Sequence, residues 1–319
     1  MNLEDEFAQY RGELVAHCYR MLGSLHDAED AVQETYLRAW RGFADFEQRS
    51  SVKTWLYRIA TRVCLNALQH SSRRMVPSAL GAPGTDPHDL EAHSLETSWL
   101  EPFPDHLLSS DPAQVVGTRQ SLRLAMVAAL QHLPPRQRAV LILRDVLAWQ
   151  ASEVAGLLDT TTAAVNSSLQ RARAEMAKLA PAEDEFSEPE EPVRRALLDQ
   201  FAKAFEQADL VALEGLLTQD TRWEMPPIPT WFSGRVDVLR LLAAKLTPGE
   251  GLRQMVEISA NGQPAFALYG RGRDGIFHAH SLKVVTVTKA GISAVMAFHK
   301  PALFPAFGLP LDRMPDSAE

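Results

Sequence analysis

The sequence has few cysteines and no long apolar run. Its 319 residues include only Cys18 and Cys64, too few for a disulfide framework, and both fall in apolar helical patterns. Two buried thiols in a reducing compartment are the plain interpretation, and a redox pair is the alternative. No stretch approaches the roughly 20 apolar residues of a transmembrane helix, and the acidic N-terminus MNLEDEFAQY is no signal peptide. These absences predict a cytoplasmic protein without a membrane partner.

Basic residues are also in the minority, which at first argues against nucleic acid as a partner. The chain has 32 Lys and Arg against 40 Asp and Glu, a net charge of −8. The acidic residues are concentrated, however. Residues 76–118 carry −7 and residues 181–192 carry −6, whereas residues 119–180 between them carry +4. The acidity therefore marks two connecting segments and leaves nucleic-acid binding open.

The chain is longer than one hydrophobic core usually supports, so we expect a multidomain fold: two all-α domains followed by an α+β domain. Apolar spacing predicts the helices 27–41, 52–70, 119–133, 136–147, 152–158, 161–179, 193–208, 210–217 and 235–246. Alternation between turns predicts the strands 221–225, 254–259, 265–269, 277–288 and 292–298, the last four as an antiparallel meander. The predicted domains are 1–75, 114–180 and 193–312, with a flexible acidic linker at 76–113, another at 181–192 and a tail at 313–319.

The predicted helix 27–41 has two distinct faces. Its predicted buried face consists of Ala28, Val32, Tyr36, Ala39 and Trp40. Its opposite face consists of Asp30, Gln33, Glu34, Leu37 and Arg38. The second face is polar and mostly charged, so it is available to a partner.

Helices 152–158 and 161–179 are joined by a short turn, which is typical of a helix-turn-helix. Thr161 or Thr162 can cap the second helix, because a hydroxyl accepts from the first-turn amides. The residues expected at base edges are Thr162, Ala163, Asn166, Ser167 and Gln170, and those expected at phosphates are Arg136, Arg138, Arg171 and Arg173. The alternative is an ordinary helical hairpin with a solvated polar face.

The predicted helix 52–70 mixes aromatic and cationic side chains. The run Trp55-Leu56-Tyr57-Arg58-Ile59-Ala60 is followed by Arg62, Asn66, Arg73 and Arg74. Such a combination suits unstacked single-stranded bases. Core aromatics beside a solvated arginine face are the alternative, which composition alone favours.

Taken together, these stretches resemble bacterial RNA polymerase sigma factors of the sigma-70 family, extracytoplasmic-function type. The resemblance rests on DAEDAVQE (27–34) with Leu37 and Trp40, TWLYRIA (54–60) with Asn66, LP (133–134) with RQR (136–138), and EVA (153–155) with RAR (171–173). These motifs cover about residues 1–180. The resemblance implies core RNA polymerase and promoter DNA as partners, a role in promoter recognition, melting and transcription initiation, and no catalytic residue, cofactor or metal.

The resemblance also assigns positions. Asp30, Gln33, Glu34 and Leu37 would dock on the clamp helices of the largest polymerase subunit, since an acidic face suits a basic partner. Phe46 lies in the loop that captures a flipped base of the minus-ten element, and the other expected minus-ten contacts are Lys53, Arg58, Arg62, Asn66, Arg73 and Arg74. The helix-turn-helix would read the minus-thirty-five duplex. It has Asn166, Ser168 and Gln170 where relatives often carry cations, which predicts either weak binding in isolation, with reliance on polymerase, or an unusual recognition sequence.

The first acidic linker acquires a role from the same resemblance. It would thread into polymerase channels built for polyanions and mimic a nucleic acid there. A solvated spacer, extended by self-repulsion, is the alternative.

Residues 193–310 resemble, more loosely, SnoaL-like members of the NTF2-like superfamily, which implies a cone-shaped sheet around a pocket. The candidate pocket residues are Trp223, Met225, Trp231, Phe232, His278, His280 and His299, with His278 and His280 expected on one strand face. A plain aromatic core is the alternative. Because no acid–base pair is evident, we expect a regulatory domain that takes a small molecule or another part of the chain. The competing hypotheses are a SnoaL-like isomerase or hydrolase fused to a DNA-binding region, and a polymerase-independent helix-turn-helix regulator.

Overall fold

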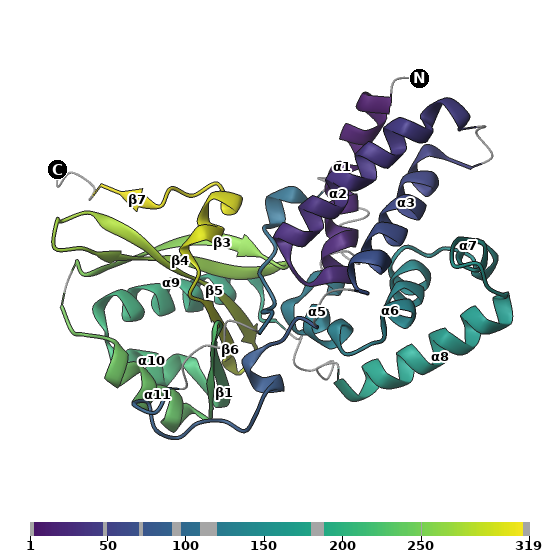
Figure 1. The fold of residues 1–319 in the computed structure, drawn as a ribbon. Helices are drawn as coiled ribbons and strands as arrows, with labels where there is room; N and C mark the ends of the chain where they lie inside the picture. Colours follow the sequence, from purple (N-terminus) through teal and green to yellow (C-terminus); the bar gives the residue numbers. More distant parts are fainter. Residues whose placement is uncertain are drawn as a thin grey trace. The chain divides into compact units, whose positions relative to one another are not determined.

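The structure, a computed structural model, describes residues 3–46, 50–69, 73–90, 97–108, 120–179, 188–249 and 251–314. The chain forms two compact units (Figure 1). A helical unit comprises residues 1–74 and 100–180, and a sheet unit comprises residues 75–99 and 181–319. The predicted linker 76–113 is thus shared between the two units. The second predicted linker is described only from residue 188 onward.

The first half of the helical unit packs three long helices. They are α1 (Leu3–Leu22), α2 (Leu25–Gly42) and α3 (Val52–Ala67), with a short 3-10 turn η1 (Phe43–Asp45) after α2. Ser24 caps α2 by accepting a hydrogen bond from the Asp27 amide at 3.2 Å. Cys18 and Cys64 are both buried free thiols.

Residues 100–103 are fixed to this helical bundle. The buried Glu101 carboxylate accepts hydrogen bonds from Ser24 Oγ at 2.8 Å and from the Leu25 amide at 3.1 Å. A carboxylate at this place also complements the positive N-terminal end of α2. Tyr19 donates to the Glu101 carbonyl oxygen at 2.6 Å, and its ring packs on the buried Phe103. Residues 100–103, which the sequence assigned to the first acidic linker, are therefore part of the helical core.

The second half of the helical unit is also built from helices, which among its described residues are short or of medium length. They include α5 (Leu124–Gln131), α6 (Pro135–Leu141), α7 (Ala151–Leu157) and α8 (Thr162–Leu179). A π-helical turn η4 (Ile142–Val146) extends α6, and a 3-10 turn η3 (Asp105–Leu107) lies upstream of α5. Pro135 starts α6, where its missing N–H costs nothing. The helices predicted for residues 120–179 are thus present.

The sheet unit is an α+β domain whose strands follow the order β2-β1-β6-β5-β4-β3. The strands are β1 (Leu217–Met225), β2 (Ile228–Ser233), β3 (Arg253–Ala260), β4 (Gln263–Arg271), β5 (Phe277–Thr288), β6 (Gly291–Phe298) and β7 (Asp312–Arg313). Strands β3 to β6 form the predicted antiparallel meander. The sheet as a whole is mixed, because β1 pairs with β6 in parallel. Strand β2 was not predicted.

Three helices cover one side of this sheet (Figure 1): α9 (Glu191–Gln207), α10 (Leu210–Leu216) and α11 (Arg235–Lys245). Their apolar residues form one core with β1, β4, β5 and β6, which includes Phe201, Phe205 and Trp223. A 3-10 segment η6 (Pro301–Phe307) packs the Phe304 ring against the Tyr269 ring, with the ring centroids 5.1 Å apart. The predicted α+β class of this domain is confirmed.

Residues 77–84 lie along the edge strand β2 and its neighbour β1 in the same unit. They begin with a 3-10 turn η2 (Pro77–Ala79). The Ser78 amide donates to Glu224 Oε2 at 2.9 Å, Trp231 Nε1 donates to the Gly81 carbonyl at 2.9 Å, and the Gly84 amide donates to the Trp231 carbonyl at 2.7 Å. Glu224 is buried, and this burial raises its pKa. Part of the predicted flexible linker is therefore held by the sheet.

Candidate functional site

The exposed face of α2 carries the residues predicted to dock on polymerase. Asp30, Gln33 and Leu37 are exposed, and Glu34 is half-buried. Glu34 accepts from Arg38 Nε at 2.7 Å, and Asp30 lies 3.6 Å from His26 Nε2. The opposite face is buried through Ala28, Ala31, Val32, Thr35 and Ala39. The structure thus gathers the four predicted residues on one surface of the helix.

Trp40 corrects one prediction about this helix. The sequence placed Trp40 on the buried face, but its side chain is 56% exposed. Thr35 and Ala39 continue the buried stripe instead, because Trp40 lies about 100° around the helix from Ala39. Leu37 is 47% exposed and lies one turn before Trp40. The two side chains form an exposed apolar pair beside the acidic residues.

The loop after α2 and the start of α3 are rich in aromatic contacts. Phe46 stacks on Trp55 with ring centroids 4.7 Å apart, and Phe43 lies 6.2 Å from the same ring. Residues 47–49 of this loop lie outside the described residues. Lys53 Nζ forms an ion pair with Glu13 Oε2 at 2.6 Å, so the Glu13 carboxylate already neutralises part of the Lys53 charge.

Arg62 and Asn66 are exposed on α3 and face the helix-turn-helix. Arg62 Nη2 lies 3.4 Å from the Leu157 carbonyl oxygen and 3.5 Å from Asp159 Oδ2. A cavity of about 470 Å³ lies beside them. Its polar lining residues are Arg38, Arg62, Asn66, Gln69, Arg136 and Asp159. Three arginines against one aspartate make this a basic hollow, and it brings together residues predicted for the minus-ten and minus-thirty-five elements.

Two other predicted cations of this region have internal partners. Arg73 hydrogen-bonds to His132, and burial lowers the pKa of both groups. Arg74 forms an ion pair with Asp27 at the start of α2. Arg58 is half-buried. These contacts tie residues 73–74 to the helical unit.

The helix-turn-helix forms as predicted. Thr161 Oγ1 accepts from the Ala164 amide at 3.2 Å and starts α8, while a capping box of Gln150 and Glu153 starts α7. The buried side of α8 consists of Val165, Leu169, Ala172 and Met176. The exposed side contains Thr162, Asn166, Ser167, Gln170, Arg171 and Arg173. Every residue predicted to contact DNA from this helix thus lies on its exposed side.

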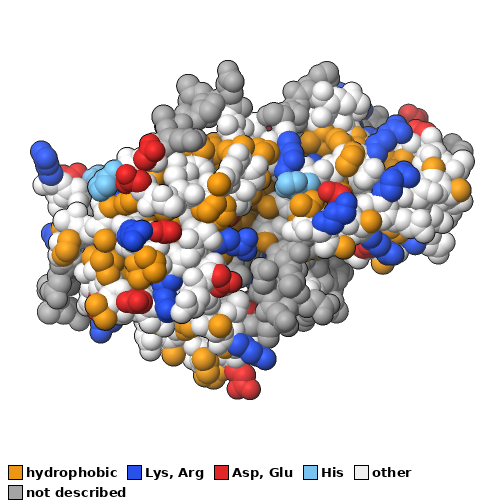
Figure 2. Space-filling view, turned by 90° about the horizontal axis from the view of Figure 1, so that it is seen from below, with side chains coloured by type: hydrophobic (Ala, Val, Ile, Leu, Met, Phe, Trp, Pro, Cys, Tyr) orange, Lys and Arg blue, Asp and Glu red, His pale blue; other side chains and the backbone are white. Residues whose placement is uncertain are grey.

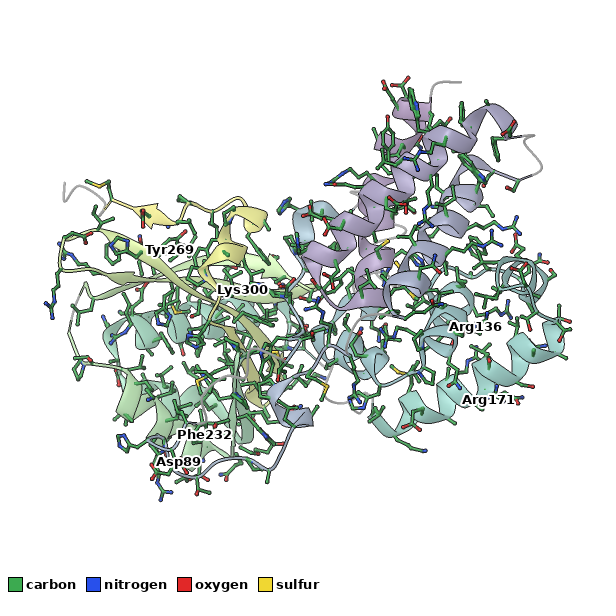
Figure 3. The ribbon with its side chains drawn as sticks, viewed as in Figure 1. Asp89, Arg136, Arg171, Phe232, Tyr269 and Lys300 are labelled. Atoms are coloured by element: carbon green, nitrogen blue, oxygen red, sulfur yellow. The ribbon has the colours of Figure 1, made fainter. Side chains whose placement is uncertain are left out.

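Charged residues around α8 differ in how free they are. Arg136 on α6 and Arg171 on α8 are exposed (Figure 3). Arg173 is held by two hydrogen bonds to Asp145, at 2.9 and 2.6 Å, which raise its pKa. Seen from below, the helical unit displays more Lys and Arg than Asp and Glu side chains (Figure 2). This basic balance suits a polyanion.

Arg138 corrects a second prediction. It was expected to contact phosphate, but only 3% of it is exposed. Its guanidinium donates to the Met21 carbonyl, to Gln131 Oε1 at 2.7 Å, and to the carbonyls of Gln131 and Leu133 at 3.0 and 3.2 Å. Burial lowers the pKa of Arg138 to about 10, so it stays protonated at neutral pH. The hydrogen bonds of its guanidinium therefore connect α6 to α1 and α5, and the group is not available to a ligand.

The candidate pocket residues of the sheet unit separate into groups. Trp223, Met225 and Phe232 are buried in the apolar core, which agrees with the alternative of a plain aromatic core. Trp231 is half-buried and binds the Gly81 carbonyl. His280 and His299 contact each other with ring centroids 5.0 Å apart.

His278 and His280 do not act as one pair. A bulge in β5 opposite Leu268 and Tyr269 interrupts the alternation that placed both on one face. His278 is exposed and binds Asp312 at 2.6 Å and Asp274 at 3.0 Å, and these partners raise its pKa. His278 therefore holds β7 against β5 and is not part of a pocket with His280.

Comparison with known proteins identifies the helical unit. A model of sigma-70 region 2 matches residues 7–74, and a model of sigma-70 region 4 matches residues 123–176. The ECF RNA polymerase sigma factor SigG of Mycobacterium tuberculosis is 48% identical over 306 residues, covering 94% of this chain and 82% of that protein. The chain belongs to the ECF RNA polymerase sigma factors. As a sigma factor, it acts with RNA polymerase and promoter DNA to direct transcription initiation.

A solved relative shares the whole fold. The crystal structure of the Mycobacterium tuberculosis extracytoplasmic function sigma factor SigJ matches with a TM-score of 0.61 at 24% identity, covering 97% of this chain and 100% of that chain. The predicted family and fold class are therefore confirmed. None of the described helices is long and apolar enough to cross a membrane. Within the described ranges, no group of three or more His, Cys, Asp and Glu side chains is arranged to hold a metal ion.

Sequence reasoning missed three residues of this sigma factor. Glu101 was assigned to a linker and is a buried cap of α2. Trp40 was assigned to a core and is exposed. Lys283 was not singled out, yet it is buried in the sheet unit. The signal for Lys283 was present, because a lysine within the apolar run LKVVTV occupies a core position of a strand.

Proposed function

We propose that this sigma factor reads a minus-thirty-five duplex with the exposed side of α8 and a separated minus-ten strand with α3 and the loop at Phe46. The observation that carries the proposal is the side of α8, where Asn166 and Gln170 are exposed beside Arg171. Amide side chains can pair with base edges, and an arginine can neutralise a phosphate. The stack of Phe46 on Trp55 supplies an aromatic platform for an unstacked base.

The same proposal assigns α2 to core polymerase and places the protein in the cytoplasm. Asp30, Gln33, Glu34 and Leu37 share one accessible surface with Trp40. An acidic surface with an apolar centre suits a basic helical partner, because charge steers the encounter and apolar contact holds it.

Transcription with purified core polymerase tests promoter reading. We expect the full-length protein to direct run-off transcripts from a subset of genomic fragments, whose 5′ ends locate the promoter. The double variant Asn166→Ala/Gln170→Ala should lower the yield about 30-fold, because each amide contributes roughly 1 kcal/mol or more at its base. Lys178→Ala, on the same helix and exposed, is the matched control. Absence of any promoter-specific transcript would contradict the proposal.

The C-terminal domain, in this proposal, restrains the sigma regions. Support comes from residues 77–84, which connect regions 2 and 4 and are hydrogen-bonded to Glu224 and Trp231 of the sheet. A connecting segment held in this way limits how regions 2 and 4 separate. Threading of the linker into polymerase channels requires the release of these contacts.

Glu224→Ala tests the restraint. We expect at least about a threefold rise in run-off yield, because the buried carboxylate makes a charge-assisted bond to the Ser78 amide, worth about 1.5–3 kcal/mol. Glu257→Ala, an exposed glutamate on β3, should leave the yield unchanged. An unchanged yield in both variants would show that the C-terminal domain does not act through this segment.

A further inference from the structure

Lys283 occupies a core position of the C-terminal domain. It lies on β5 and is only 3% exposed. Its cross-strand neighbours are Phe266 on β4 and Ala297 on β6, and both belong to the apolar core. Lysine is almost never fully buried unless it is paired, because its ammonium loses hydration. Its position here calls for a chemical explanation.

The Lys283 amine lies beside two aromatic rings. Nζ lies 4.8 Å from the centroid of the Phe205 ring and 5.6 Å from that of the Trp223 ring. The two rings are nearly parallel, with an interplanar angle of 3°. Among the described residues, no carboxylate forms an ion pair with Lys283. Burial without a counter-charge lowers its pKa to about 7, so about half of the amine is neutral at pH 7.

Two imidazoles extend this cluster toward solvent. Both side chains are only partly accessible to solvent, and their rings are in contact. Burial, and then the charge of Lys283, lower the pKa of His280 to about 4 and that of His299 to about 3. Arg253 contributes to the shift of His280. Both imidazoles are therefore neutral at pH 7, and they supply no negative charge that would keep the amine protonated.

We propose that Lys283 is a carbonyl-binding residue whose Nζ forms an imine with a small apolar aldehyde or ketone. The Nζ lone pair attacks the carbonyl carbon, the C=O bond breaks, and both Nζ hydrogens leave with the oxygen as water. The imine nitrogen then takes a proton from water, and the Phe205 and Trp223 rings stabilise the resulting cation by cation–π attraction. A neutral, desolvated lysine is the form that such chemistry needs. The inference goes beyond promoter recognition and does not depend on it.

Reductive trapping on the full-length protein tests the inference. The protein is incubated with benzaldehyde and sodium cyanoborohydride at pH 7, where hydride from the cyanoborohydride converts an imine into a stable secondary amine. Proteolysis and mass spectrometry then locate each benzyl group. We expect Lys283 to be modified at least about tenfold faster than Lys245 and Lys289, which are exposed to water and lack its desolvated surroundings.

Controls make the outcome decisive. Lys283→Met should lose the fast modification, and Lys289→Met should retain it. In urea the advantage of Lys283 should disappear, because it depends on burial. Modification of Lys283 no faster than that of Lys289 in the folded wild-type protein overturns the inference. That comparison is made within one protein, so it stands even where Lys283→Met does not fold.

Discussion

Replacing Trp40 by alanine is expected to weaken the binding of core RNA polymerase at least about 30-fold. The side chain is 56% exposed at the end of α2 and lies one turn after the exposed Leu37. A large aromatic side chain that becomes buried at the centre of an interface typically contributes 2 kcal/mol or more, which is about 30-fold in Kd. The acidic residues Asp30 and Glu34 on the same helix contribute less, because rim charges act mainly on the association rate. Titration of labelled sigma factor against core polymerase measures the effect.

Two matched variants accompany this measurement. Leu37→Ala should weaken binding by a smaller factor, because it removes fewer apolar contacts. Leu311→Ala removes a leucine of the same 47% exposure from the C-terminal domain and should leave binding unchanged. Because Trp40 is exposed, its loss should barely alter the thermal unfolding temperature. Wild-type affinity in Trp40→Ala would remove this surface from the docking interface.

Replacing Arg138 by methionine is expected to lower the free energy of unfolding of the helical unit by about 3 kcal/mol. The guanidinium donates to one side-chain and three main-chain oxygens on α1, α5 and the turn before α6. Methionine fills a similar volume but leaves these buried acceptors without a donor, and each such loss costs about 1–3 kcal/mol before relaxation. Urea unfolding followed by far-UV circular dichroism measures the change.

The neighbouring arginine provides the control. Arg136→Met, on the exposed side of the same helix, should change the stability by less than about 0.5 kcal/mol. Arg138→Lys should fall between the wild type and Arg138→Met, because an ammonium supplies donors without the planar fork. Equal stability of Arg136→Met and Arg138→Met would contradict a structural role for Arg138. In a promoter-binding assay, only Arg136→Met should act without loss of fold.

Several parts of this sigma factor could be predicted because they depend on local patterns. The turn between α7 and α8, the cap at Thr161 and the exposed side of α8 follow from apolar spacing and hydroxyl chemistry within about 30 residues. The acidic side of α2 follows in the same way from a period of 3.6 residues. The motifs of the family then supplied the function of these surfaces.

Other parts required partners distant in the sequence. The helical period of apolar residues predicted that Trp40 is buried. The packing of α2 on its neighbours instead buries Ala39 and leaves Trp40 exposed. Alternation put His278 and His280 on one face, and a bulge in β5 changed that. Composition made residues 76–113 a spacer, although Glu101 caps α2 and Ser78 binds Glu224. In each case, a contact between residues far apart in the sequence decided the outcome.

By itself, the sequence determined that this chain is a sigma factor with two helical DNA-binding regions and an α+β domain, because helix period, caps and motifs are local properties. Only the tertiary structure decided which charges are free to act. Arg136 and Arg138 are two residues apart on one helix. Arg136 is exposed and free to contact a ligand, whereas Arg138 is buried and hydrogen-bonds to neighbouring helices. Lys283 is one lysine among several in the sequence, and the packing of Phe205, Trp223 and Phe266 around it removes its water and changes its chemistry.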